Sequence, residues 1–449
     1  MNVKSSIADF LAEFDLYDDQ TAVIWHNRSV SYREILNRIN WWRIKLAEIL
    51  PGTVVSIEGD FSPEAISILF VLIEMNIIVV PLDINHVNKN EKKYDIAQVR
   101  IIIRIKSEDD IEVVYRNISS KPNDYYELLI KRHVPGLVLF TSGSSGEPKA
   151  AVHDFSKLLI KFNVKRKALR TINFLLFDHW GGLNTLFHIL SNGGTVILLE
   201  SRNPDYVCDL IEKYQVELLP TSPTFLNMLV LSRAYERRNL ESLKIISYGA
   251  EPMPDSLLKH LNKIFPNITL QQTYGLIELG VMRSKSETNS SLWVKIGGEG
   301  FETRVLDGIL QVKSDSAMIG YLNAVSPFTE DGWFITGDTV EVKGDYFKIL
   351  GRKSEQINVG GEKVFPQEVE SVILSMESVL DVIVYGEKHP FTGSIVCAKV
   401  YLDDQADRKT YLKQIKLHCK EKLEPFKVPI KLIVVDEPFF SDRFKKKRF

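Results

Sequence analysis

The chain has 449 residues, which is too long for one compact core, so we expect two or more domains. Its 56 lysines and arginines against 58 aspartates and glutamates leave a net charge of -2, which gives no reason to expect a nucleic-acid or membrane-surface partner. The three cysteines lack the spacing of a metal site or a disulfide framework, and the first residues lack the apolar core of a secretory signal. We therefore expect a cytoplasmic protein with no membrane insertion.

The first hundred residues predict short strands that alternate with helices. Apolar runs that are typical of buried strands occur at 21–25, 54–57 and 77–80. One helix is expected to begin after Ser31, because Glu34 follows it at the spacing of a capping box, and another is expected to begin at Pro63. This alternation favours an α/β fold with parallel strand pairing.

A polar, glycine-rich loop follows the apolar run 137–140, which predicts another buried strand. Glycine lets backbone N–H groups turn toward an anion, while the loop's hydroxyls and lysine add donors and positive charge. A surface linker is the alternative, but a linker rarely follows directly on an apolar run. We interpret the loop as a binding site for a polyphosphate. The residues expected to bind it are Thr141, Ser142, Gly143, Ser144, Ser145, Gly146 and Lys149.

Further elements are predicted downstream of this loop. A helix is expected from Ser156 to about Arg170, and residues 293–325 alternate in short strands. The C-terminal piece predicts strands at 379–385 and 394–401, an amphipathic helix at 408–423 and a last strand from Val428.

The loop at 141–149 resembles the phosphate loop of the adenylate-forming superfamily, which is Thr-Ser-Gly-Ser/Thr-Thr-Gly-x-Pro-Lys-Gly. That superfamily includes acyl-CoA synthetases, aryl-acid ligases and peptide-synthetase adenylation domains. Segments that resemble its other motifs follow in the same order over nearly the whole chain: Phe-Asp-His-Trp-Gly-Gly-Leu at 177–183, Tyr-Gly-Ala-Glu-Pro at 248–252, Tyr-Gly-Leu-Ile-Glu at 274–278, Gly-Trp-Phe-Ile-Thr-Gly-Asp at 332–338 and Gly-Arg at 351–352.

The resemblance implies a nucleotide site. Tyr274 is expected to stack on adenine, together with the turn Gly249, Ala250 and Glu251, and with Thr273 and Gly275 beside it. Asp338 is expected to accept the ribose hydroxyls, with Arg352 as a second contact. Glu278 is the expected Mg²⁺ ligand, since Mg²⁺ prefers hard oxygen ligands. Ile277 stands where relatives carry a Thr that contacts the α-phosphate.

The carboxylic acid substrate is expected to contact Asp178, His179, Phe225 and Tyr248. An Asp at position 178 would hold an ammonium group in amino-acid-activating relatives, but the Gly-Gly-Leu that follows resembles acyl and aryl ligases more closely. The alternative for Asp178 and His179 is a polar strand end that caps the next helix. Which acid is used is left open.

The C-terminal residues are expected to form a mobile domain. The resemblance implies an α/β fold with a large N-terminal domain of α/β layers at 1–351, which contains a small β-rich subdomain, and a small mobile α+β domain at 352–449. Ser354 lies at the hinge position, and Gly360 and Gly361 form the loop that approaches the pantetheine arm of a thiol substrate. Lys445 aligns with the catalytic lysine, with Lys446 and Lys447 next to it.

The implied function is ATP-dependent activation of a carboxylic acid to an acyl-AMP, with release of pyrophosphate, followed by transfer to a thiol. CoA is the leading acceptor. A stand-alone adenylation enzyme that loads the phosphopantetheine of an acyl carrier protein is the second hypothesis. A degenerate homologue without catalysis is the third, because Ile277 replaces a Thr and Phe444 replaces a Gly.

Overall fold

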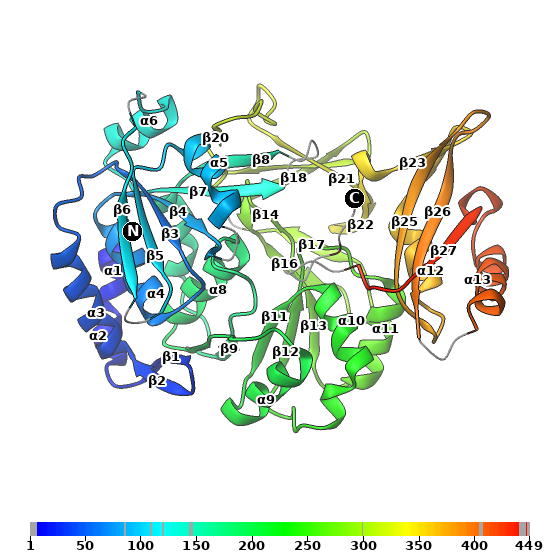
Figure 1. The fold of residues 1–449 in the computed structure, drawn as a ribbon, viewed down its shortest axis with the longest axis horizontal. Helices are drawn as coiled ribbons and strands as arrows, with labels where there is room; N and C mark the ends of the chain where they lie inside the picture. The colour runs from blue at the N-terminus through cyan, green and yellow to red at the C-terminus, as the bar shows by residue number, and fades with distance from the viewer. Residues whose placement is uncertain are drawn as a thin grey trace.

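The computed structural model describes residues 7–84, 87–107, 110–118, 121–142, 147–298, 300–403, 407–439 and 446 (Figure 1). Two seven-stranded sheets, a six-stranded sheet and a five-stranded C-terminal sheet make up most of these residues. Within the described ranges, we find no helix that is both long and apolar enough to cross a bilayer.

The first seven-stranded sheet is parallel except at the edge strand β2. Its strands, in spatial order, are β13 (Thr269–Gln272), β12 (Ile245–Tyr248), β11 (Leu218–Thr221), β9 (Arg170–Ile172), β10 (Thr195–Ile197), β1 (Thr21–Trp25) and β2 (Arg28–Ser31). The helices that follow or join these strands are α3 (Tyr32–Lys45), α8 (Trp180–Leu190), α9 (Pro204–Tyr214), α10 (Pro223–Ser232) and α11 (Asp255–Ile264).

The second seven-stranded sheet has a parallel centre, β3, β4, β5 and β7, flanked by antiparallel strands. Its order is β20 (Gly320–Tyr321), β8 (Pro148–Asp154), β7 (Gly136–Ser142), β4 (Ile78–Leu82), β3 (Val54–Glu58), β5 (Ile101–Ile105) and β6 (Ile111–Tyr115). The associated helices are α1 (Ile7–Ala12), α2 (Phe14–Tyr17), α4 (Pro63–Glu74), α5 (Val87–Ala97), α6 (Asp124–Arg132) and α7 (Phe155–Leu159). One apolar cluster joins helix α4 to strands of both sheets, so the two sheets share a core.

The third sheet is antiparallel and forms the small β-rich part. Its order is β16 (Arg283–Ser286), β17 (Val294–Gly297), β22 (Tyr346–Arg352), β21 (Phe334–Lys343), β19 (Ile309–Ser314) and β18 (Phe301–Leu306). A short hairpin of β14 (Gly275–Leu276) and β15 (Gly280–Val281) leads into it from the first sheet.

The C-terminal sheet has its own apolar core and lies apart from the other three sheets, at the right of Figure 1. It contains β24 (Glu362–Val364), β23 (Ile357–Val359), β26 (Gly393–Leu402), β25 (Val379–His389) and β27 (Lys431–Val435). Helices α12 (Pro366–Ile373) and α13 (Arg408–Lys422) pack on it. Short 3₁₀ turns occur at Ile160–Asn163, Ala234–Glu236, Lys353–Glu355 and Pro425–Lys427.

Most predicted elements are present, and two need correction. The helix predicted from Ser156 to about Arg170 is wrong in length, because α7 ends at Leu159 and a single 3₁₀ turn follows. Phe162 stacks on Phe187 of α8 at 5.7 Å, so tertiary packing takes the chain out of a helical path. The last strand begins at Lys431 rather than Val428, because a 3₁₀ turn precedes it and Pro429 lacks the N–H of a central strand residue.

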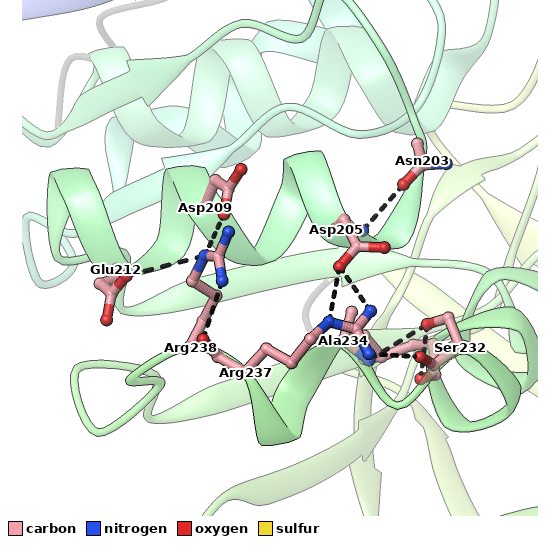
Figure 2. A network of polar contacts seen from close by, with 9 residues as sticks. Asn203, Asp205, Asp209, Glu212, Ser232, Ala234, Arg237 and Arg238 are labelled. Atoms are coloured by element: carbon pink, nitrogen blue, oxygen red, sulfur yellow. Dashed lines mark hydrogen bonds and ion pairs between the residues drawn. The ribbon is translucent and has the colours of Figure 1, made fainter.

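A surface network ties α9 to the turn that follows α10 (Figure 2). Arg237 donates two bonds to Oδ1 of Asp205, at 3.1 and 2.5 Å, while Arg238 pairs with Asp209 and lies 3.9 Å from Glu212. These side chains are largely exposed, so each pair contributes little to stability by itself. Together these pairs hold the turn after α10 against α9.

Candidate active site

A cleft of about 2230 Å³ lies where the first sheet, the β14–β15 hairpin, the third sheet and the C-terminal sheet meet. The carboxyl ends of β11, β12 and β13 open into it, at Thr221, Gly249 and Thr273. In open α/β sheets this edge collects ligands, because the loops that leave it diverge and expose backbone groups. Most of the motifs singled out in the sequence converge on this cleft.

Tyr274, Asp338 and Arg352 form the centre of the predicted nucleotide site. The Tyr274 hydroxyl donates to Oδ2 of Asp338 at 2.5 Å, and Nε of Arg352 lies 3.5 Å from Oδ1. Asp338 and Arg352 face each other across the β21–β22 pair. Burial raises the pKa of Tyr274 well above its usual value, so the phenol stays neutral and keeps donating. Burial also raises the pKa of Asp338, and the Tyr274 and Arg352 partners oppose that rise.

The turn after β12 has a conformation that restricts which residues can occupy positions 249 and 250. A Cβ on Gly249 would lie 2.4 Å from Oγ1 of Thr273, so only glycine fits there. Ala250 has a φ of +66°, a left-handed conformation that is uncommon for a residue with a side chain. The Thr273 hydroxyl donates to the carbonyl of Tyr248 at 3.1 Å, which fixes the turn against β13. This turn lies on the cleft wall.

Glu251 binds protein groups rather than standing free in the cleft. Its Oε2 accepts hydrogen bonds from the hydroxyl and the backbone N–H of Thr224, at 2.6 and 3.2 Å, in the first turn of α10. A carboxylate at a helix N-terminus is stabilised by the helix dipole. Its Oε1 accepts from the backbone N–H of Lys446 at 2.5 Å. Glu251 thus connects the turn, α10 and the C-terminal tail.

Glu278 and Lys149 both contact Tyr321. The Tyr321 hydroxyl donates to Oε1 of Glu278 at 2.5 Å, and Nζ of Lys149 lies 5.6 Å from the centre of the same ring. Glu278 is partly exposed on the cleft wall. Among the described residues, no group of three or more His, Cys, Asp or Glu side chains is arranged to hold a metal. A single carboxylate nevertheless fits Mg²⁺, which protein sites often bind through one or two carboxylates together with substrate phosphates.

The phosphate-loop prediction is only partly within the described structure. Thr141 and Lys149 face each other in the register of β7 and β8, and Ser142 ends β7. Thr141 lines the cleft. The predicted residues between them lie outside the described residues: Gly143, Ser144, Ser145 and Gly146.

Asp178 and His179 lie at the start of α8, on the cleft wall. His179 is the N-cap of this helix, because its Nδ1 accepts a hydrogen bond from the N–H of Gly181 at 3.0 Å. The capping interpretation and the cleft-lining interpretation therefore both hold for His179. Trp180 lines the cleft as well, next to Gly280 of the hairpin.

Phe225 and Tyr248, which were expected to contact the acid, are not among the described residues that line the cleft. Phe225 is fully buried against Phe174, with ring centres 4.5 Å apart. Tyr248 is 1% exposed and packs in the same core. Side chains alternate along a strand, and it is Ser247 that faces the cleft from β12. From α10 the cleft receives Thr224 instead of Phe225.

The predicted C-terminal residues differ in where they lie. Ser354, in a 3₁₀ turn, is on the cleft wall. Gly360 and Gly361 form the β23–β24 turn with φ values of +62° and +96°, and they are not among the described residues that line the cleft. Lys445 lies outside the described residues. Nζ of the neighbouring Lys446 is 3.2 Å from Oε2 of Glu370 and 3.8 Å from Oδ1 of Asp381.

The chain matches two family models and is similar to known proteins along most of its length. The model of the AMP-binding enzyme family matches residues 12–307, and that of the AMP-binding enzyme C-terminal domain matches residues 368–439. An indoleacetate–CoA ligase of Aromatoleum aromaticum is 24% identical, over 93% of this chain and 92% of that protein. A 2-succinylbenzoate–CoA ligase of Bacillus licheniformis is 29% identical, over 67% of this chain and 66% of that protein.

The fold is also that of solved structures. An anthranilate CoA ligase in complex with anthranoyl-AMP superposes with a TM-score of 0.83 at 19% identity, over 97% of this chain and 94% of that one. A structure of ATP-bound MatB from Rhodopseudomonas palustris gives a TM-score of 0.80 at 21% identity, over 99% of this chain and 97% of that one.

Proposed function

Because this chain belongs to the AMP-binding enzyme family, we propose that it activates a carboxylic acid with ATP and passes the acyl group to the thiol of CoA. In the first step the acid's carboxylate attacks the α-phosphorus, an acyl-AMP forms and pyrophosphate leaves. In the second step the thiol attacks the acyl carbon and AMP leaves. Two of the relatives are CoA ligases, one for indoleacetate and one for 2-succinylbenzoate, which supports CoA as the acceptor.

The observation that carries this proposal is the Tyr274–Asp338–Arg352 group beside the Gly249 turn. The ring of Tyr274 gives adenine an apolar face, and Gly249 lets the base approach the backbone closely. The Asp338 carboxylate has lone pairs left for ribose hydroxyls after it accepts from Tyr274. Arg352 stays charged and lies beside that carboxylate, so it is placed to contact ribose or phosphate.

The first step brings two anions together, so positive charge must lie near the transferring group. We assign this charge to Lys149 and to Lys445, the latter from its alignment in the sequence. Glu278 and the phosphates of ATP would hold Mg²⁺, which would supply further positive charge. Ile277 offers no hydroxyl to the α-phosphate, and we therefore expect slow adenylation.

We further propose that the chain divides at residues 351 and 352, and that Ser354 lies at a hinge. The C-terminal sheet has a core of its own, which is what an independently moving domain requires. Gly360 and Gly361 are glycines with positive φ in an exposed turn away from the cleft. A rotation about the hinge would exchange the C-terminal tail for this turn at the cleft, so that the thiol reaches the acyl-AMP.

The test is isotope exchange between pyrophosphate and ATP with a panel of fatty, aryl and amino acids. Exchange that depends on one acid class is expected and would establish adenylation. Addition of CoA should then produce AMP and an acyl-CoA. Exchange without turnover on CoA, but with acyl transfer to an added carrier protein, would replace CoA by a carrier as the acceptor. An enzyme that binds ATP yet exchanges with no acid would contradict the proposed activity.

A further inference from the structure

A network of buried polar side chains leads from the core of the second sheet to the cleft. Glu58, at the end of β3, is fully buried, and its Oε2 accepts a hydrogen bond from Nε of Arg104 at 2.7 Å. Its Oε1 accepts from Nδ2 of Asn90 at 2.9 Å and from the Tyr94 hydroxyl. A buried carboxylate is unfavourable unless it is paired and hydrogen-bonded, and this one is both. The network therefore holds α5 in a fixed position beside β3.

The side-chain amide of Asn90 orients Lys93. Asn90 is fully buried, and its Nδ2 donates to Glu58 and, at 3.0 Å, to the carbonyl of Asp83, so both amide hydrogens are used. The oxygen Oδ1 is left to face Lys93, whose Nζ donates to it at 3.3 Å. Asn90 carries no charge, so this bond orients the ammonium and does not neutralise it.

Lys93 lines the part of the cleft that the second sheet forms. The described residues that line this part with it are Phe140, Thr141 and Pro148, from the end of β7 and the start of β8. Nζ of Lys93 lies 5.7 Å from the centre of the Phe140 ring. The residues proposed for adenine and ribose come instead from the end of the first sheet and from the third sheet. A nucleotide bound along the cleft would therefore extend its phosphates toward Lys93.

We propose that Lys93 binds the terminal phosphate of ATP, and with it the pyrophosphate that leaves. The inference rests on the proposed function, since that function requires a triphosphate in this cleft. During adenylation the bond between the α-phosphorus and the bridging oxygen breaks, and its electron pair passes to the pyrophosphate. An ammonium beside the terminal phosphate stabilises this additional negative charge. Because Asn90 has already oriented the ammonium, little entropy is lost when the phosphate binds.

Calorimetric titrations with ATP, pyrophosphate and AMP, in the presence of Mg²⁺ and without acid, measure the binding of each. AMP lacks the phosphates that Lys93 would contact, so it reports whether the adenosine site is intact. The variant is Lys93→Met. The matched control is Lys92→Met, because Lys92 is the neighbouring residue of α5, is 60% exposed, pairs with Glu147 and is not among the described residues that line the cleft. Both variants lose one positive charge from the same helix.

We expect Lys93→Met to weaken the binding of ATP and of pyrophosphate by about tenfold or more and to leave AMP binding unchanged. Lys92→Met should have little effect on any of the three. Unchanged affinity for ATP and pyrophosphate in Lys93→Met would overturn the inference, and so would an equal loss in Lys92→Met. A higher KM for CoA with unchanged ATP affinity would also overturn it, because Lys93 would then serve the acceptor.

Asn90 is a positioning residue in this proposal, and a double-mutant cycle tests that role. Asn90→Ala should weaken ATP binding severalfold in the unsubstituted chain and have no further effect in Lys93→Met. A merely structural role would lower the affinity for ATP and for AMP in both backgrounds, and that result would overturn the positioning role.

Pyrophosphate exchange with the acid panel distinguishes this inference from the proposed function. ATP binding that depends on Lys93, in a protein that exchanges with no acid, would retain the phosphate contact and contradict the proposed adenylation. Exchange in Lys93→Met with an unchanged rate and an unchanged KM for pyrophosphate would retain adenylation and overturn the contact.

Discussion

Asp338 is the residue on which the proposed nucleotide site depends most directly. Its carboxylate accepts a hydrogen bond from the Tyr274 hydroxyl, its backbone N–H donates to the Thr336 hydroxyl, and it faces Arg352 across two paired strands. The carboxylate is therefore fixed in orientation before ATP arrives. A group that is fixed in advance loses little entropy when it binds a ligand, so its two oxygens can discriminate ribose from other partners.

We expect Asp338→Ala to weaken ATP binding by about tenfold or more, because hydrogen bonds to a charged acceptor contribute about 1.5–3 kcal/mol. Calorimetric titration with ATP in the absence of acid measures this directly. Asp331→Ala is the control, since Asp331 is exposed and pairs only with surface groups in the described structure. Unchanged ATP affinity in Asp338→Ala would show that ribose binds elsewhere.

Ile277 allows a test of the missing hydroxyl. Ile277 lines the cleft and packs against two apolar clusters. Replacing it by Thr therefore removes apolar packing and at the same time adds a hydroxyl donor. Thr and Val have nearly the same shape, so the pair Ile277→Thr and Ile277→Val separates the two effects. We expect the exchange rate of the Thr variant to exceed that of the Val variant several-fold. Equal rates would mean that the hydroxyl does not reach the α-phosphate here.

Sequence motifs singled out residues for the proposed nucleotide site that the structure brings together, but they did not predict the burial of Phe225. Tyr274, Asp338 and Arg352 stand in recognisable patterns and meet in the structure. The bond between the first two joins residues 64 apart, and no spacing rule predicts it. Phe225 was expected at the substrate because aromatic residues suit apolar pockets, yet the same property places it in the core.

At the scale of single elements, local signals were reliable where they act through the backbone. The Ser31 hydroxyl accepts from the N–H of Glu34, and the Glu34 carboxylate accepts from the N–H of Ser31, so the predicted capping box is present in full. The helix predicted after residue 156 is shorter than expected, because contacts with distant segments, which no local signal reveals, determine where it ends. Its end is decided by the stacking of Phe162 on α8 and by the bond of Lys161 to β15, which are contacts with distant segments.

Ser31→Ala should lower the free energy of unfolding by about 1 kcal/mol, which is typical for the loss of an N-cap. Ser29→Ala is the matched control, because Ser29 is an exposed residue of the neighbouring strand β2. Urea denaturation followed by the far-ultraviolet circular dichroism of both variants gives the comparison. A loss equal to that of the control would mean that the helix start is held by its packing rather than by its cap.

At the scale of the whole molecule, the described residues show polar contacts that link the C-terminal sheet to the rest. The side-chain amide of Asn227 donates to the backbone carbonyl of Leu380 at 2.9 Å, and the hydroxyl of Ser256 donates to the backbone carbonyl of Ser371 at 3.2 Å. Lys446 adds a third link, from Glu251 in the large part to Glu370 and Asp381 in the C-terminal part. Contacts of this kind are consistent with the movement of the C-terminal part that we propose.

The position of Lys446 also separates the lysines of the tail. Its ammonium is already paired with two carboxylates, and the Glu370 side chain is almost fully buried, so Lys446 itself is anchored in this arrangement. A lysine that neutralises the transferring phosphate cannot at the same time neutralise these carboxylates. The division of roles that we propose gives catalysis to Lys445 and anchoring to Lys446.

We therefore expect Lys445→Ala to abolish pyrophosphate exchange. Thioester formation from supplied acyl-AMP and CoA should continue, because pyrophosphate has already left the α-phosphorus before that step. Lys446→Ala should lower exchange by only about threefold to tenfold, the amount associated with about 1 kcal/mol of lost anchoring. Glu370→Gln should reproduce this smaller effect, since it weakens the same ion pair from the other side. If Lys446→Ala abolishes exchange and Glu370→Gln does not, then Lys446 leaves its carboxylates during the reaction and is itself the catalytic lysine.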